Sequence, residues 1–85
     1  MERPPADPPS DETIIDAVLG GAVDRYAELV ARYREPAWRL AYGFVGHAED
    51  AKELSQNALV KAYRHLAAFR RQAKFSTWLY RIVAN

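Results

Sequence analysis

The stretch VDRYAELVARYREPAWRLAYGF, residues 23–44, decides the fold class because its apolar side chains recur every three or four residues. The stripe comprises Val23, Tyr26, Val30, Tyr33, Ala37, Leu40 and Phe44. This spacing matches the 3.6-residue period of a helix, and no segment of the chain alternates as a strand does. Because the apolar stripe keeps the same helical phase before and after Pro36, we expect one long helix kinked near that proline. Two collinear helices are the alternative. Gly46 is expected to end it.

Three more helices follow from the same period on either side of this stretch. Their expected ranges are Glu12–Leu19, Glu49–Leu66 and Phe75 to the last residue, Asn85. The first of them presents the apolar side chains Ile14, Ile15, Val18 and Leu19. Ser10 or Asp11 is suited to cap the first of them, and Gly20 to stop it. The sequence therefore predicts an all-α fold, a small domain of about four helices over residues 12–85. No glycine or proline closes the last helix, so a second domain is expected beyond Asn85.

Composition limits what this chain can be. Residues 1–11 hold four of the five prolines among charged residues and are predicted to form a disordered tail. A chain of 85 residues without cysteine must be held by packing alone, which fits the reducing cytoplasm. No apolar run is long enough for membrane insertion. Phosphate-cradling glycine loops, nucleophile motifs and paired catalytic carboxylates are absent, and His47 and His65 have no ligand partner at metal spacing. We expect neither an enzyme nor a cofactor or metal.

The charges are segregated along the chain. Residues 54–85 carry six cations and no carboxylate, whereas all 11 acids lie in residues 1–53. Within the basic half, the stretch FRRQAKFSTWLYRIVAN, residues 69–85, interleaves cations with aromatic rings. Such a surface can neutralise phosphates and stack bases, so it indicates nucleic-acid binding. The alternative is a solvated basic face beside ordinary core aromatics.

The two C-terminal helices each have a predicted polar face. On the last helix, Phe75, Leu79, Ile82 and Val83 form the apolar sector, with Trp78 at its border and assigned to core packing. The opposite sector holds Lys74, Thr77, Arg81 and Asn85, beside the basic loop of about residues 68–74. On the preceding helix, Leu54, Ala58, Ala62 and Leu66 share one side. The other side holds Glu53, Gln56, Asn57, Val60 and Arg64. The aliphatic Val60 is out of place on this polar face, which the residues alone describe as a solvated helix face.

Two segments carry a resemblance to a known family. DAKELSQNALVKAY, residues 50–63, followed by KFSTWLYRI, residues 74–82, resembles region 2 of bacterial sigma factors of the extracytoplasmic-function (ECF) type. The family's typical sequence is DAEDLVQETFLRAY, then a loop, then FSTWLYRI. The resemblance covers about Thr13 to Asn85. The chain differs from that sequence at four positions that bear on polymerase affinity: Lys52, Ser55, Asn57 and Ala58. It also carries Arg71-Gln72 where Gly-Asp is common, a departure that bears on promoter preference.

The resemblance implies a non-catalytic transcription initiation subunit. Its second and third helices would dock on the clamp coiled coil of the largest subunit of core RNA polymerase, through Glu53, Gln56, Asn57, Val60 and Arg64. Its loop and last helix would recognise and melt the minus-ten promoter element, and the loop would hold a flipped base of the single-stranded non-template strand. The DNA-binding residues so implied are Phe69, Arg70, Arg71, Gln72, Ala73, Lys74, Thr77, Arg81 and Asn85. An anti-sigma factor is a further expected partner.

Two other function classes remain open from the residues alone. A helix-turn-helix regulator of duplex DNA would need a tight turn before its recognition helix, and the loop before Phe75 is long and basic for such a turn. A helical protein-interaction module would use the polar face of the third helix for another protein. Preference for single-stranded over duplex DNA and co-purification with core polymerase separate these classes.

Overall fold

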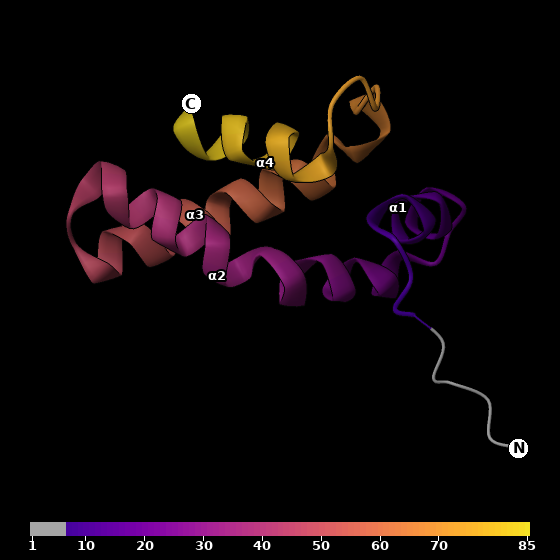
Figure 1. Ribbon diagram of the computed structural model, residues 1–85, viewed down its shortest axis with the longest axis horizontal. Coiled ribbons are helices and arrows are strands. Elements are labelled where there is room, and N and C mark those ends of the chain that lie inside the picture. The colour runs from indigo at the N-terminus through magenta and orange to yellow at the C-terminus, as the bar shows by residue number, and fades with distance from the viewer. Residues whose placement is uncertain (1–6) are drawn as a thin grey trace, which may run out of the picture.

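The computed structural model describes residues 7–85, so the first six residues of the predicted tail lie outside the described part. Its elements are α1 (Asp11–Leu19), η1 (Val23–Arg25), α2 (Tyr26–Val45), α3 (Ala48–Arg64), η2 (Leu66–Ala68) and α4 (Phe75–Ala84). Over this range there is no strand, and the predicted all-α fold of four helices is confirmed. Figure 1 shows α2 and α3 folded back on each other, α4 above α3, and α1 across one end of the molecule.

The long helix passes through its proline without a break. α2 is continuous from Tyr26 to Val45 with Pro36 inside it, so the alternative of two collinear helices is wrong. Proline costs the helix one backbone hydrogen bond, and the apolar stripe on both sides of it keeps the register across that gap. The helix ends where predicted, because Gly46 adopts the left-handed conformation at φ 72° and its N–H donates to the Tyr42 carbonyl at 2.8 Å.

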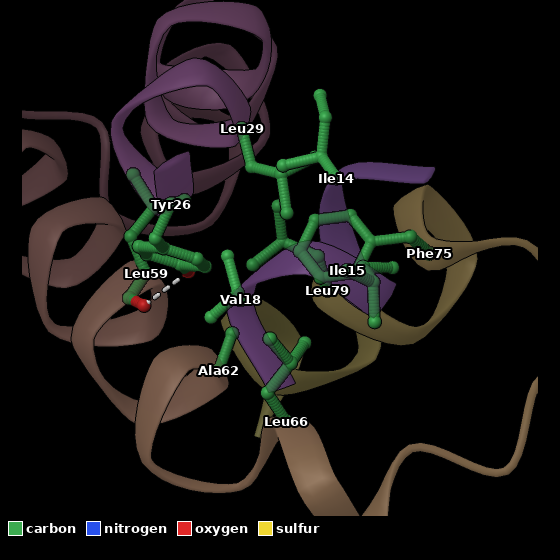
Figure 2. Packing of buried hydrophobic residues seen from close by; sticks show 10 residues of the cluster. All are labelled: Ile14, Ile15, Val18, Tyr26, Leu29, Leu59, Ala62, Leu66, Phe75 and Leu79. Atoms are coloured by element: carbon green, nitrogen blue, oxygen red, sulfur yellow. Dashed lines mark hydrogen bonds between the residues drawn. The ribbon is translucent and has the colours of Figure 1, made fainter. Parts of the chain in front are cut away.

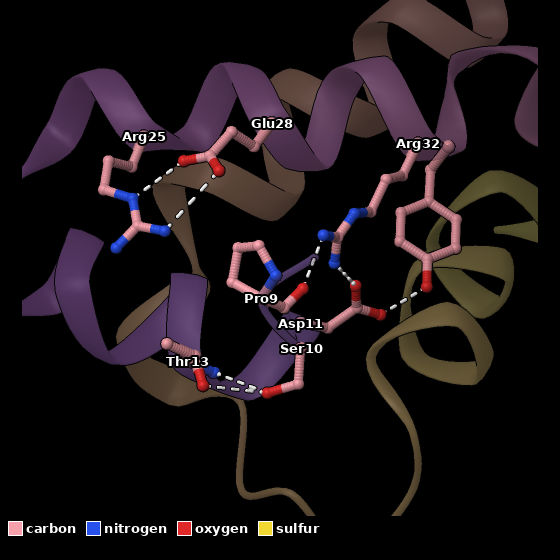
Figure 3. Close-up of polar contacts among 8 residues, drawn as sticks. Pro9, Ser10, Asp11, Thr13, Arg25, Glu28 and Arg32 are labelled. Carbon is pink, nitrogen blue, oxygen red and sulfur yellow. Dashed lines mark hydrogen bonds and ion pairs between the residues drawn. The ribbon is translucent and has the colours of Figure 1, made fainter. Parts of the chain in front are cut away.

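The first helix is capped and tied to α2 by residues assigned to the tail. The hydroxyl of Ser10 accepts from the backbone N–H of Thr13 at 3.1 Å and caps α1. Asp11 accepts from the Arg32 guanidinium at 2.9 Å, as Figure 3 shows. It also accepts from the Tyr33 hydroxyl. The Pro9 carbonyl also accepts from Arg32, at 2.5 Å (Figure 3). Residues 9–11 thus supply the predicted cap, Ser10, and the acceptors that anchor α1.

The main core lies where α1 meets the other three helices. Ile14 and Ile15 of α1 and Leu29 of α2 are completely buried there. Figure 2 shows the cluster, which comprises Ile14, Ile15, Val18, Tyr26, Leu29, Leu59, Ala62, Leu66, Phe75 and Leu79. One polar group enters it, the Tyr26 hydroxyl, which donates to the Leu59 carbonyl at 2.6 Å (Figure 2). A second cluster of small residues at the other end of α2 lets the helices approach closely: Ala37, Ala41, Ala51, Ala58 and Val83.

Three predicted core positions are exposed instead. Leu19 and Val23 are about half exposed, because they lie at the end of α1 and in the short η1 turn rather than within a packed helix. Phe44 shares the face of Ala37 but lies in the last turn of α2, and 59% of its surface is exposed. The buried face of α2 includes Leu29 and Ala41, which the predicted stripe omits.

Candidate functional site

The predicted partner-binding face of α3 is solvent-accessible along its length. Its five residues, Glu53, Gln56, Asn57, Val60 and Arg64, are all exposed. Val60 is 49% exposed. The structure thus places these side chains on one accessible surface, with an apolar residue among the polar ones.

This face borders a hollow that the sequence did not predict. The hollow has a volume of about 670 Å³ and lies between α3 and the first turns of α2. Its lining comprises Val23, Asp24, Tyr26, Ala27, Val30, Gln56, Leu59, Val60 and Tyr63. The Tyr63 ring packs against Tyr26 with a centroid separation of 5.0 Å and is still 41% exposed. Val23, Val60 and Tyr63 therefore form one exposed apolar surface, contributed by two segments of the chain.

Two of the four residues that differ from the family's typical sequence in α3 lie in the interior. Ser55 is buried, and its hydroxyl donates to the Lys52 carbonyl at 3.1 Å within α3. Ala58 is buried in the small-residue cluster between α2 and α3. Each of these two residues keeps only 4% of its surface exposed. Lys52 and Asn57, the other two departures in this helix, are exposed.

The basic loop is anchored at its start by aromatic packing. Phe69 is partly buried, and its ring lies 4.9 Å from Trp78 and 6.0 Å from Phe75, measured between centroids. Beside it a hollow of about 230 Å³ opens, lined by Ala68, Phe69, Arg70, Arg71, Gln72, Ala73, Trp78 and Arg81. Six predicted DNA-binding residues thus meet at one hollow. Lys74, Thr77 and Asn85 do not line it.

Trp78 has a wider role than the sequence indicated. The prediction of core packing is confirmed, since its ring contacts Phe69 and Phe75 and packs against the main core. The same side chain also lines the loop hollow, together with Ala68, and neither was among the predicted site residues. The border position of Trp78 on the helical wheel is the signal that could have indicated both contacts.

The cations around this hollow differ in their surroundings. Arg70, Lys74 and Arg81 are exposed, and within residues 7–85 none of them pairs with a carboxylate. Arg71 has the left-handed backbone conformation, with φ 60°, and its guanidinium donates to the Asp16 carboxylate of α1 at 2.5 Å. That hydrogen bond, with the nearby charge of Glu12 as a smaller contribution, raises the pKa of Arg71. Gln72 and Asn85 are exposed amides.

Residues 7–85 hold neither a cluster of metal-ligating side chains nor a helix that could cross a membrane. In residues 7–85 no three His, Asp or Glu side chains converge as a metal site would require. None of the helices in that range combines the length and the apolar character needed to span a bilayer.

Comparison with known proteins identifies relatives over most of the chain. The model of the protein family described as Sigma-70 region 2 matches residues 29–85 of this chain. The ECF RNA polymerase sigma factor SigW of Bacillus subtilis is 37% identical over 71 residues, which are 84% of this chain and 38% of that protein. The ECF RNA polymerase sigma-E factor of Escherichia coli strain K12 is 36% identical over 76 residues, 89% of this chain and 39% of that protein. The chain thus spans about two fifths of the length of these relatives.

A solved structure shares the fold. It is described as an NMR structure of the complex formed by an engineered region 2 of sigmaE in complex with GTAAAA. The superposition has a TM-score of 0.82 at 36% sequence identity and covers 91% of this chain and 80% of that one. Together with the match over residues 29–85, this shared fold shows that the chain belongs to the Sigma-70 region 2 family, as the two quoted segments indicated.

Proposed function

We propose that this domain acts in transcription initiation by binding core RNA polymerase through the exposed face of α3 and capturing the minus-ten promoter element with residues 69–74 and α4. The observation that carries the proposal is the convergence of exposed cations, an amide and an aromatic ring on one hollow. Arg70 and Arg81 lie at its wall with Gln72 and Trp78. The structural relative in complex with GTAAAA supports a nucleic-acid ligand for this fold.

The size and chemistry of the loop hollow suit a single base. Its volume of about 230 Å³ is below the roughly 300–1,000 Å³ of pockets that take drug-sized ligands. Unstacking a base from a duplex costs a few kcal/mol, so melting needs contacts that only a single strand can make. Trp78 lines the hollow with an aromatic side chain. Gln72 can donate to and accept from a base, and Arg70 and Arg81 can hold the flanking phosphates.

Binding to matched single-stranded and duplex oligonucleotides tests the DNA part. The starting oligonucleotide is GTAAAA, followed by a panel in which one base is changed at a time, each offered single-stranded and within a duplex. We expect tighter binding to the non-template single strand than to the duplex, measured by fluorescence anisotropy. A preference for duplex DNA would instead support the helix-turn-helix alternative and overturn this assignment.

Replacing Val60 by glutamate tests the polymerase-binding face. Val60 is half exposed beside an apolar hollow, so a charge there should weaken the complex with core polymerase by about 1–2 kcal/mol without unfolding the domain. Leu19→Glu is the matched control, because Leu19 is an equally exposed aliphatic residue outside the face. Equal binding by Val60→Glu and the wild-type chain in a titration with core polymerase would show that this face is not the contact.

The same face is also the proposed target of an anti-sigma factor. Such a protein would block polymerase by covering Val23, Val60 and Tyr63, the exposed apolar surface at the larger hollow. Val60→Glu should then weaken both complexes, and the two partners should compete for the wild-type domain. Simultaneous binding of both partners to one domain would place the inhibitor elsewhere.

A further inference from the structure

We infer that Asp16 of α1 is a positioning residue for DNA capture, and that Arg71 serves as its tether to the loop rather than as a phosphate contact. This inference rests on the proposed DNA-binding function and concerns how the loop is held for it. The two residues are 55 positions apart, and their side chains meet at 2.5 Å between Arg71 Nη2 and Asp16 Oδ1. Figure 1 shows the loop and α1 at the same end of the molecule.

Arg71 makes the polar contact that holds the middle of the loop. Among the hydrogen bonds and ion pairs of residues 7–85, the bond to Asp16 is the one made by residues 70–73. The two ends are held differently, at Phe69 by aromatic packing and at Lys74 by its carbonyl, which accepts from the Trp78 N–H at 3.1 Å. Without the ion pair, four exposed or half-exposed residues would span the gap with no side-chain anchor.

The backbone at Arg71 is adapted to this contact. Its φ of 60° lies in the left-handed region, which a non-glycine residue adopts at a cost of about 1 kcal/mol or more. That conformation turns the side chain towards α1, and a third of the side chain remains exposed. The neighbouring Arg70 is better placed to bind a phosphate, because it is exposed and makes no such contact.

Asp16 stands on a rigid support. Its helix is capped by Ser10, buries Ile14 and Ile15 completely, and is bonded through Asp11 to α2. Within α1 itself a carboxylate near the C-terminal end is unfavourable, since the helix dipole presents its negative end there. The contact that compensates for this placement is Arg71. The loop is therefore held by α1, and α1 is in turn held by α2.

The direction in which Asp16→Asn changes DNA affinity distinguishes a tether from a phosphate contact by Arg71. If Asp16 positions the loop, the variant populates the competent loop conformation less and binds the best oligonucleotide of the panel about two- to fivefold more weakly. If Arg71 contacts phosphate instead, the variant frees that cation and binding becomes stronger. Asp24→Asn is the matched control, because it removes one carboxylate that pairs with no cation within residues 7–85.

Two further variants test the ion pair at constant net charge and the phosphate contact of Arg71 directly. The swap Asp16→Arg with Arg71→Asp preserves both the net charge and the ion pair, and aspartate tolerates the left-handed backbone, so affinity and base preference should return close to those of the wild-type chain. Arg71→Asn should lower base preference and leave the slope of log Kd against log salt unchanged. A slope lowered by about 0.7, the value for one phosphate contact on a single strand, would overturn the inference.

Amide hydrogen exchange of residues 69–74 in the DNA-free 85-residue chain supplies a readout that does not depend on the proposed function. Asp16→Asn should accelerate exchange there while leaving the buried amides of α1 as protected as in the wild-type chain. Should the wild-type chain fail to bind any oligonucleotide, the proposed function is wrong and this measurement still decides the tether. Unchanged exchange in the loop would show that Asp16 does not hold it.

Discussion

At the scale of single residues, Tyr26 links stability to pH. Burial raises its pKa to about 12 from the usual 10, and its hydroxyl donates to the Leu59 carbonyl at 2.6 Å. Because the folded state keeps this proton more tightly than the unfolded state, its contribution is complete below pH 10 and is lost as the pH rises towards 12. Two pKa units correspond to about 2–3 kcal/mol. We expect the free energy of unfolding to fall by about that amount over this window.

The Tyr26→Phe variant is the control for this prediction. It keeps the ring and lacks the titrating group, so chemical denaturation between pH 9 and 12 should show a smaller fall. At neutral pH the variant should lose only about 1 kcal/mol, because the Leu59 carbonyl also has a helical partner. Tyr33, whose pKa burial and the hydrogen bond to Asp11 also raise to about 12, should account for part of the remaining fall. Identical pH profiles for the two chains would refute the assignment to Tyr26.

At the scale of elements, two glycines of α2 should respond oppositely to alanine. Gly46 ends the helix at φ 72° and a Cβ there would meet no atom within 4 Å, so Gly46→Ala tests the backbone conformation alone. We expect a loss of about 1 kcal/mol. Gly43 lies within the helix in similarly open space, and Gly43→Ala should stabilise the domain by about 0.5–1 kcal/mol. Thermal or urea unfolding measures both, and equal signs would contradict the assigned helix end.

At the scale of the whole molecule, the segregated charge should control DNA binding through salt. Arg70, Lys74 and Arg81 are exposed and unpaired within residues 7–85, so replacing any one by alanine should weaken binding to every oligonucleotide of the panel. Each loss of a phosphate contact should lower the slope of log Kd against log salt by about 0.7. Affinities measured across several salt concentrations check this.

Gln72→Ala supplies the contrast to those variants. An amide reads base edges through directional hydrogen bonds, whereas cations on phosphates carry no sequence information. The variant should therefore change which base is preferred and leave the salt slope as it is. Equal loss on all oligonucleotides would remove Gln72 from base recognition.

The apolar period and the distribution of charge were sufficient to predict much of this domain. Four helices, the continuity of α2 through Pro36, its end at Gly46 and the exposed face of α3 all depend on neighbours within one or two turns, which a sequence displays directly. Errors arose at helix ends, as with Phe44, because the period places a residue on a face but does not say how far the covering helices extend.

Tertiary structure alone decided which distant residues meet. The hollow beside α3 joins Val23 to Val60, the loop hollow joins Arg70 to Trp78, and the ion pair joins Asp16 to Arg71. Local periodicity carries no information on such contacts, since they depend on how the helices and the segments between them pack against one another. The sequence by itself determined the helices and the basic character of the loop. The packing of α1 determined that one of the loop's cations is directed back to the protein, where a carboxylate holds it.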